Sequence, residues 1–316
     1  MKKETSSGIL NIDKPLGQSS HDVVERVRAL TRVRRVGHAG TLDPLATGVL
    51  VVCVGRMATR VVEYLMDEPK VYRTDVQLGA VTATFDAEGE VLATSPVDVG
   101  RDEVESALAQ FRGVIRQIPP MYSAVKHRGK PLYKLARRGI EVEREPRRVE
   151  IYRLDLVAWE PDAEEARCTL EIKCSAGTYV RVLVHDLGQN LGCGAYVTGL
   201  TRLASGDFHL EDAVTLEQFA QAVEEGRWFD LLEPVDEALA HRFPPLYLDA
   251  DEARRLCSGQ PFSHGDEKTE DEALARAYGP EGRFLALAAY DRHESVWRPH
   301  KVFVSRYPHP DVPGDD

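Results

Sequence analysis

The stretch that most constrains the fold is GHAGTLDPLATGVL, Gly37 to Leu50, which runs straight into an apolar segment, Val49 to Val54. The apolar segment is typical of a buried strand, so the polar, glycine-bearing part before it is expected to form a loop. Within that loop, Pro44 fixes its own φ and pushes Asp43 towards extended backbone. A lone carboxylate on such a stiffened loop suits a reactive acid. The alternative is a turn in which Asp43 only accepts hydrogen bonds from backbone amides.

Hydrophobic periodicity elsewhere predicts both strands and helices. Strands are expected at 8–13, 49–54, 71–78, 148–159, 166–175 and 194–206, with 148–159 and 166–175 as a candidate pair. Helices are expected after a serine cap at Ser19 or Ser20 and at 57–66, 101–111, 180–191 and 215–225. Beyond a proline-rich break at 240–245, a helix at 250–256 and short strands at 283–289 and 302–305 indicate a small β-rich domain.

The length and composition fit one large domain or two, with 316 residues and a 43% apolar fraction that supports a real core. The five cysteines are scattered without a CxxC pair, which suits a reduced cytosol better than a disulfide framework or a zinc site. The N-terminus lacks the apolar core of a signal peptide, and no apolar run approaches the roughly 20 residues of a membrane helix. A cytoplasmic protein is therefore expected.

The net charge of −11 argues against a nucleic-acid partner, but the charge is unevenly distributed. From 211 to 316 there are 11 Lys and Arg against 23 Asp and Glu, whereas 112–153 holds 12 basic and 4 acidic residues. Because screening limits the reach of charge to roughly 8–10 Å, a polyanion responds to such local patches. RNA therefore remains a candidate ligand. The alternative is that the basic residues only form solvent-exposed faces of helices.

Within the basic region, 118–142 begins with a proline pair and continues as a basic arm that carries tyrosines. We interpret it as an insertion that contacts a partner. The residues expected to meet an RNA backbone are Lys126, Arg128, Lys130, Lys134, Arg137 and Arg138.

Common catalytic motifs are missing from the sequence: it has no P-loop, dinucleotide fingerprint, HExxH or GxSxG. What remains is a carboxylate with cationic and aromatic partners. If Arg181 lay beside Asp43, it would favour the charged form of the acid and fix its orientation, although the sequence alone does not show that the two meet.

Five stretches resemble the TruB family of tRNA pseudouridine synthases and together span most of 8–210. They are GILNIDKPLGQSSHDVV, GHAGTLDPLATGVL, KVYRTDVQLGAVTATFDAEG, QIPPMYSAVKHRGKPLYKLARRGIEV and CSAGTYVRVLVHDLGQNLGCGAYVTGLTRL. The second stretch is long and combines residues that rarely occur side by side, so the match is far more specific than a short glycine pattern. One departure is Ala83, where many relatives carry an acid, and it lies outside the assigned site. From Leu246 onward the chain more weakly resembles the β-rich RNA-binding module called PUA.

The resemblance implies an α+β fold with a mixed, mainly antiparallel central sheet flanked by helices. It implies a catalytic domain at 1–245, with an RNA-gripping insertion at about 118–147, and a PUA-like domain at 246–316. It further implies isomerisation of uridine to pseudouridine at position 55 in the T-loop of tRNA, after the base is flipped out. This chemistry uses no cofactor and no metal. We expect a monomer with tRNA as its partner and no obligatory protein partner.

The roles of individual residues are also carried over from the resemblance. Asp43 acts at the sugar or base, either by covalent attack or by removing a sugar proton. Tyr72 stacks on the flipped base and helps to remove the C5 proton, and Arg181 pairs with Asp43. Further residues that line the site or support its loop are His38, Tyr179, Leu200 and Lys14. Each has a structural alternative, such as core packing, a capped loop histidine or a surface salt bridge.

Three rival functions remain open from the sequence. The same fold could act on another RNA with the help of partner proteins, or the protein could bind or fold RNA without catalysis. A small-molecule enzyme that uses Asp43 fits the arginine-rich segments poorly. The acidic C-terminal region is unusual for an RNA-binding module and leaves its contribution open.

Overall fold

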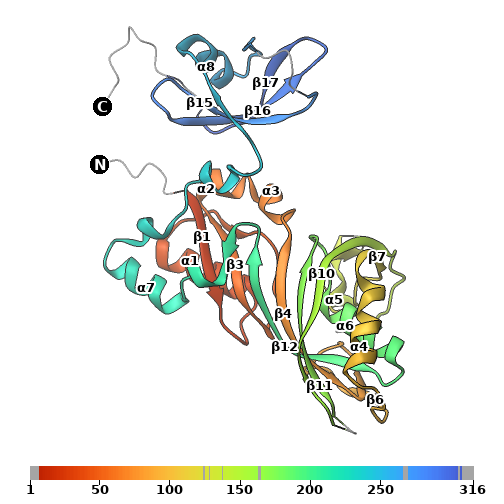
Figure 1. The fold of residues 1–316 in the computed structure, drawn as a ribbon. Coiled ribbons are helices and arrows are strands. Elements are labelled where there is room, and N and C mark those ends of the chain that lie inside the picture. The colour runs from red at the N-terminus through yellow and green to blue at the C-terminus, as the bar shows by residue number, and fades with distance from the viewer. Residues whose placement is uncertain are drawn as a thin grey trace. The chain divides into compact units, whose positions relative to one another are not determined.

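Several strands, some with alternating buried and exposed residues, form one large sheet (Figure 1). Strand β4, Lys70–Leu78, shows the pattern most clearly, because every second side chain from Lys70 onward is buried. The computed structural model describes residues 7–123, 125–127, 129–136, 138–162, 165–265, 270–304 and 307.

The strand order of this nine-stranded sheet is β1-β3-β12-β4-β11-β10-β7, with β2 paired to β3 and β13 paired to β12. Besides β4, its strands are β1 Gly8–Lys14, β2 Val36–His38, β3 Ala46–Val54, β7 Gly113–Gln117, β10 Arg147–Glu160, β11 Arg167–Cys174, β12 Ala195–Ser205 and β13 Phe208–His209. Strands β12 and β3 are parallel, whereas β4, β7, β10 and β11 join their neighbours in antiparallel pairs. The mixed, mainly antiparallel sheet and the α+β class are as expected.

Helices flank this sheet. They are α1 Ser20–Thr31, α3 Val62–Met66, α4 Arg101–Leu108, α5 Leu132–Ala136, α6 Val180–Leu191 and α7 Leu216–Glu224. Figure 1 shows α4 and α6 alongside β7, β10 and β11, with α1 and α7 beside β1. Two small hairpins add β5 Ala80–Thr82 with β6 Val91–Thr94, and β8 Lys126–His127 with β9 Lys130–Pro131. Among the described residues, no helix has the length and apolar character needed to cross a membrane.

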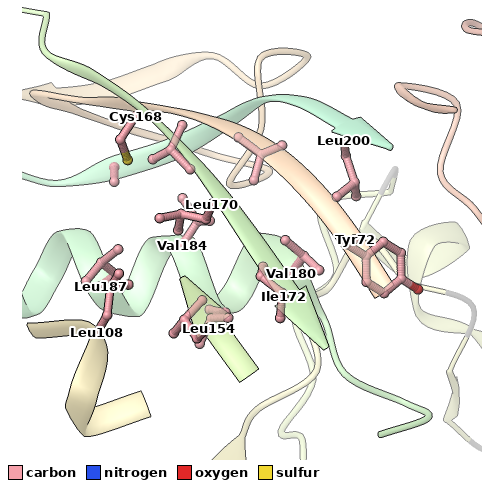
Figure 2. Packing of buried hydrophobic residues seen from close by; sticks show 14 of the residues in the cluster. Tyr72, Leu108, Leu154, Cys168, Leu170, Ile172, Val180, Val184, Leu187 and Leu200 are labelled. Carbon is pink, nitrogen blue, oxygen red and sulfur yellow. The ribbon is translucent and has the colours of Figure 1, made fainter. Parts of the chain in front are cut away.

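The core of the sheet lies where α6 packs on β12 and β4. Helix α6 presents Val180, Val184 and Leu187 to this core, since residues three or four apart share a helix face. Figure 2 shows this cluster, with Leu187 towards one end and Tyr72 at the other. The aromatic ring of Tyr72 thus stands where the apolar core gives way to the loops.

A second, four-stranded sheet has the order β14-β15-β16-β17, with strands Pro245–Tyr247, Leu274–Tyr278, Phe284–Asp291 and Val296–Val302. Helix α8, Ala250–Cys257, packs on β16 and β17. This is the expected small β-rich region. Contacts divide the chain into two compact units, of which one holds 10–53 and 62–231 and the other holds the described parts of 1–9, 54–61 and 232–316. The expected domain boundary at 245/246 stays a prediction.

Most expected elements of the larger unit are confirmed, including the antiparallel pair β10–β11 and the helix 180–191. The single helix expected at 57–66 is wrong: α2, Gly55–Thr59, ends before α3 begins. The amides of Arg60 and Val61 bond back three residues rather than four, and two consecutive β-branched valines follow. The strand expected at 302–305 is also misplaced, since β17 ends at Val302 and Ser305 lies outside the described residues.

Candidate active site

The loop between β2 and β3 carries Asp43 and is fastened on both sides of it. The hydroxyl of Ser20, at the start of α1, accepts from the Leu42 amide at 2.7 Å and donates to the Leu42 carbonyl at 3.0 Å. After Asp43, the carbonyl of Pro44 accepts from the Gly17 amide at 2.9 Å. The Asp43 side chain itself remains 36% exposed, so the acid is held in place yet open to a ligand.

Lys14 also supports this loop through its ammonium group. Its ammonium donates to the carbonyls of Pro15 at 2.9 Å and Gln18 at 2.6 Å, and lies 3.5 Å from that of Pro44. The residue is fully buried, and burial lowers the pKa of its amine to about 8. This placement agrees with support of the loop, which is a role expected for Lys14.

Arg181 and Asp43 meet, as the resemblance implied. The Nη2 atom of Arg181 lies 2.7 Å from Oδ2 of Asp43, and the arginine side chain is only 4% exposed. The pair is therefore not a surface salt bridge. Helix α6 begins one residue before Arg181, so the side chain projects from the first turn of a well-packed helix.

Asp86 is a second carboxylate on Arg181, and no pattern in the sequence distinguished it from other acidic residues. Its Oδ2 lies 3.3 Å from Nη1 of Arg181, and the side chain is 4% exposed. The other carboxylate oxygen accepts from the Thr84 hydroxyl and from the Glu88 amide. The carbonyls of Thr84 and Tyr122 each accept from Arg181 at 2.9 Å. One guanidinium thus joins three loops to α6, with two acids sharing its charge.

The aromatic residues expected in the site are also nearby. Tyr72 is 9% exposed on β4, and burial raises the pKa of its hydroxyl. Burial likewise raises the pKa of Tyr179, which immediately precedes α6. The Asp43 carboxylate adds a smaller upward effect on both pKa values, which places both phenols within its electrostatic reach. Gln117 fixes the backbone of Tyr179 through two hydrogen bonds of 3.0 and 3.2 Å.

Leu200 and His38 complete the expected group. Leu200 is buried on β12 opposite Thr74, on the face of the sheet that also bears Tyr72 (Figure 2). His38 ends β2 just before the Asp43 loop, and its Nδ1 is buried without a hydrogen-bond partner among the described residues. Burial lowers the pKa of His38, so its ring is neutral at pH 7 and suited to stacking.

The segment between β7 and β10 holds the expected basic arm. Leu132 anchors it as a fully buried residue at the start of α5. The exposed cations are Lys130, Lys134 and Arg138, and the backbone of Lys126 lies in β8. Arg128 and Arg137 lie outside the described residues. The arm joins the site directly through Tyr122, whose carbonyl binds Arg181.

The chain matches two family models: residues 28–180 match the TruB family pseudouridylate synthase N-terminal domain, and 181–240 match the tRNA pseudouridylate synthase B C-terminal domain. It is 45% identical over 300 residues to tRNA pseudouridine synthase B of Cupriavidus metallidurans, covering 93% of each chain. It is 50% identical over 262 residues to the protein of that name from Pseudomonas aeruginosa, covering 82% of this chain and 84% of the relative.

Solved structures agree on the fold. A Cbf5-Nop10-Gar1 complex contains a chain that superposes with a TM-score of 0.69 at 25% identity, covering 95% of this chain and 85% of that one. An H/ACA RNP bound to a substrate RNA containing 2′-deoxyuridine gives a TM-score of 0.70 at 23% identity, covering 96% and 87%. With both family models matched over most of its length and relatives this similar along it, the chain belongs to the TruB family of pseudouridylate synthases.

Proposed function

We propose that this protein isomerises uridine to pseudouridine at position 55 in the T-loop of tRNA. Membership of the TruB family and relatives named tRNA pseudouridine synthase B support the reaction. The observation that carries the residue assignment is the pair formed by Asp43, which is open to a ligand, and Arg181, which is buried. This arrangement orients the acid while leaving it accessible to a ligand.

The reaction conserves every atom of the uridine. The bond between C1′ and N1 breaks, the uracil turns within the site, and C5 bonds to the same C1′. The proton on C5 is lost and N1 takes up a proton, so no electron donor is consumed. Asp43 acts on the sugar in one of two ways, by covalent attack or by removing a proton, and Arg181 holds its carboxylate in place for either.

The other residues hold the base that has left the helix. Tyr72 stacks on the flipped uracil and helps to remove the C5 proton, while Tyr179 and Leu200 shape the walls around it. Neutral His38 occupies the space that the base vacates, which offsets part of the few kcal/mol that unstacking costs. Exposed Lys130, Lys134 and Arg138 contact phosphates, which supply affinity while the T-loop shape supplies specificity.

The domain assignment belongs to the same proposal: 1–245 carries catalysis and 246–316 adds tRNA contacts. The protein works as a monomer on tRNA, in the cytoplasm where its substrate is modified. A chain of similar fold occurs in the Cbf5-Nop10-Gar1 complex, so dependence on partner proteins is the rival to exclude.

The test is tritium release from C5-labelled uridine in an unmodified tRNA transcript, using the purified protein alone with added chelator. Release from one T-loop site would support a stand-alone enzyme. Tight tRNA binding without release would instead favour the partner-dependent or non-catalytic function.

A further inference from the structure

Arg202 is a fully buried cation without a carboxylate partner among the described residues. It lies on β12, two residues after Leu200, and is 1% exposed. Its Nε donates to the Val49 carbonyl at 2.6 Å and its Nη2 to the Gly40 carbonyl at 3.1 Å. Burying a charge against neutral carbonyls is costly, and an apolar side chain would suit the interior of a sheet better. This unusual choice of residue calls for a functional reason.

The two carbonyls that Arg202 holds stand on either side of Asp43. Gly40 precedes the acid in the loop and Val49 follows it in β3, so one rigid, planar guanidinium fastens both arms of the loop. The backbones are also close here. Gly48 has φ +92°, and a Cβ on it would lie 2.3 Å from the Arg202 carbonyl oxygen, so only glycine fits opposite Arg202 in the parallel pair β3–β12.

Arg202 also faces Tyr72. The two residues are direct partners in the antiparallel pair β12–β4, and side chains opposed in this way share one face of the sheet. Burial raises the pKa of the Tyr72 hydroxyl most, and the charge of Arg202 lowers it, while the Asp43 carboxylate raises it by a smaller amount. Arg202 is therefore the group that offsets burial at this phenol.

We propose that Arg202 is a positioning residue that holds the Asp43 loop and the Tyr72 hydroxyl in fixed relation to each other. Through the carbonyls of Gly40 and Val49 it sets where the acid meets the sugar. Through the cross-strand contact it sets where the phenol meets C5 of the base. This inference rests on the proposed function and assigns a residue that the family motifs used above did not single out.

The experiment compares Arg202→Gln and Arg202→Lys with the wild type in single-turnover tritium release at saturating tRNA. Misplacing reacting groups by about 1 Å costs roughly 100-fold in rate, so Arg202→Gln is expected to lose about that much while tRNA affinity changes little. Arg202→Lys keeps the charge but lacks the two-way donor geometry, and an intermediate rate is expected. Methylguanidinium added to Arg202→Ala is expected to restore part of the rate, which a purely structural role does not predict.

Lys70 supplies the matched control. It is another buried cation, on β4 and also directed at backbone carbonyls, but those belong to Met66 and Glu68 rather than to the Asp43 loop. Lys70→Gln is expected to keep its single-turnover rate even where it lowers thermal stability. Equal rate losses in Lys70→Gln and Arg202→Gln would overturn the inference, because they would mean that any buried cation of this sheet serves.

A double-mutant cycle isolates the contact with Tyr72. In a Tyr72→Phe background, Arg202→Gln is expected to lower the rate by a smaller factor than in the wild type, because the hydroxyl that Arg202 positions is already absent. A folded Arg202→Gln protein with an unchanged rate, or a loss confined to tRNA affinity, would overturn the inference alone. If Arg202→Gln does not fold, the inference is tested by Arg202→Lys and by methylguanidinium rescue of Arg202→Ala. A wild-type rate in Arg202→Lys together with no rescue would overturn it. If the wild type releases no tritium at all, the proposed function fails and the inference falls with it.

Discussion

The change of Asp86 to Asn tests whether Arg181 needs both of its carboxylates. The substitution keeps the size of the side chain and removes the charge that lies 3.3 Å from Nη1 of Arg181. At an effective dielectric constant of about 20, two unit charges at that distance attract by about 5 kcal/mol. Most of this offsets the desolvation of two buried ions, and Asp43 and two carbonyls remain on the guanidinium. We therefore expect the free energy of unfolding to fall by about 1–3 kcal/mol.

Catalysis should suffer more than stability does. With one carboxylate gone, the guanidinium can shift towards Asp43, and a displacement of about 1 Å in the acid costs roughly 100-fold in rate. Single-turnover tritium release at saturating tRNA measures this rate, and equilibrium binding measures affinity separately. We expect a rate loss of about 100-fold with affinity within a few-fold of the wild type.

Glu88 offers the control for this experiment, because it lies in the same turn with an exposed side chain. Glu88→Gln removes the same charge from the same segment and is expected to leave both rate and stability unchanged. If Asp86→Asn keeps the wild-type rate, Arg181 needs only Asp43 and our account of the ion triad is wrong. If both variants lose rate alike, the negative charge of the turn matters for the rate and the specific contact of Asp86 with Arg181 does not.

Further predictions concern the acid, the arm, the C-terminal region and pH. Asp43→Asn is expected to abolish turnover while tRNA binding survives, and retained activity would refute the assignment. Replacing Lys130, Lys134 and Arg138 by Gln should weaken binding and reduce the slope of log K against log salt by about 2–3, as measured by titration at several salt concentrations. Deleting 246–316 should lower tRNA affinity more than single-turnover rate, and a loss confined to that rate would contradict the assigned role. Burial lowers the pKa of Lys14 and of Lys70 to about 8 in the folded protein. Between about pH 8 and 10.5 the unfolded chain therefore binds more protons than the folded protein, and the free energy of unfolding should rise with pH in this range. Urea unfolding should show this rise in the wild type and not in the Lys14→Met, Lys70→Met double variant.

Local patterns predicted the long strands and helices of the larger unit, because elements such as β4 and α6 show a regular periodicity of apolar residues. Helix α6 has the expected bounds and is followed by a glycine in the left-handed conformation, and α7 begins next to the expected start at Thr215, whose side chain forms a capping box with Gln218. The errors occur where periodicity is short. Helices α2 and α3 are each a single turn or little more, and β17 contains Pro299, which disguises its alternation.

The site could be predicted only in part, since contacts between distant segments leave no local signal. The pairing of Asp43 with Arg181 came from the family resemblance rather than from the residues. Asp86 looked like any acid in a turn, and nothing in the sequence set it apart from its neighbour Glu88. Nothing in the sequence indicated that Arg202 is buried, because arginine is rarely buried without a partner.

Arg181 and Arg202 have different roles in the site because different groups surround them. Arg181 contacts two carboxylates and orients the acid, whereas Arg202, among the described residues, binds backbone carbonyls and lies across from Tyr72 in the sheet. A carboxylate bound to Arg202 would offset its effect on the Tyr72 hydroxyl, whose pKa is already raised by burial. Because no described carboxylate pairs with Arg202, its charge acts fully on this phenol and opposes the effect of burial.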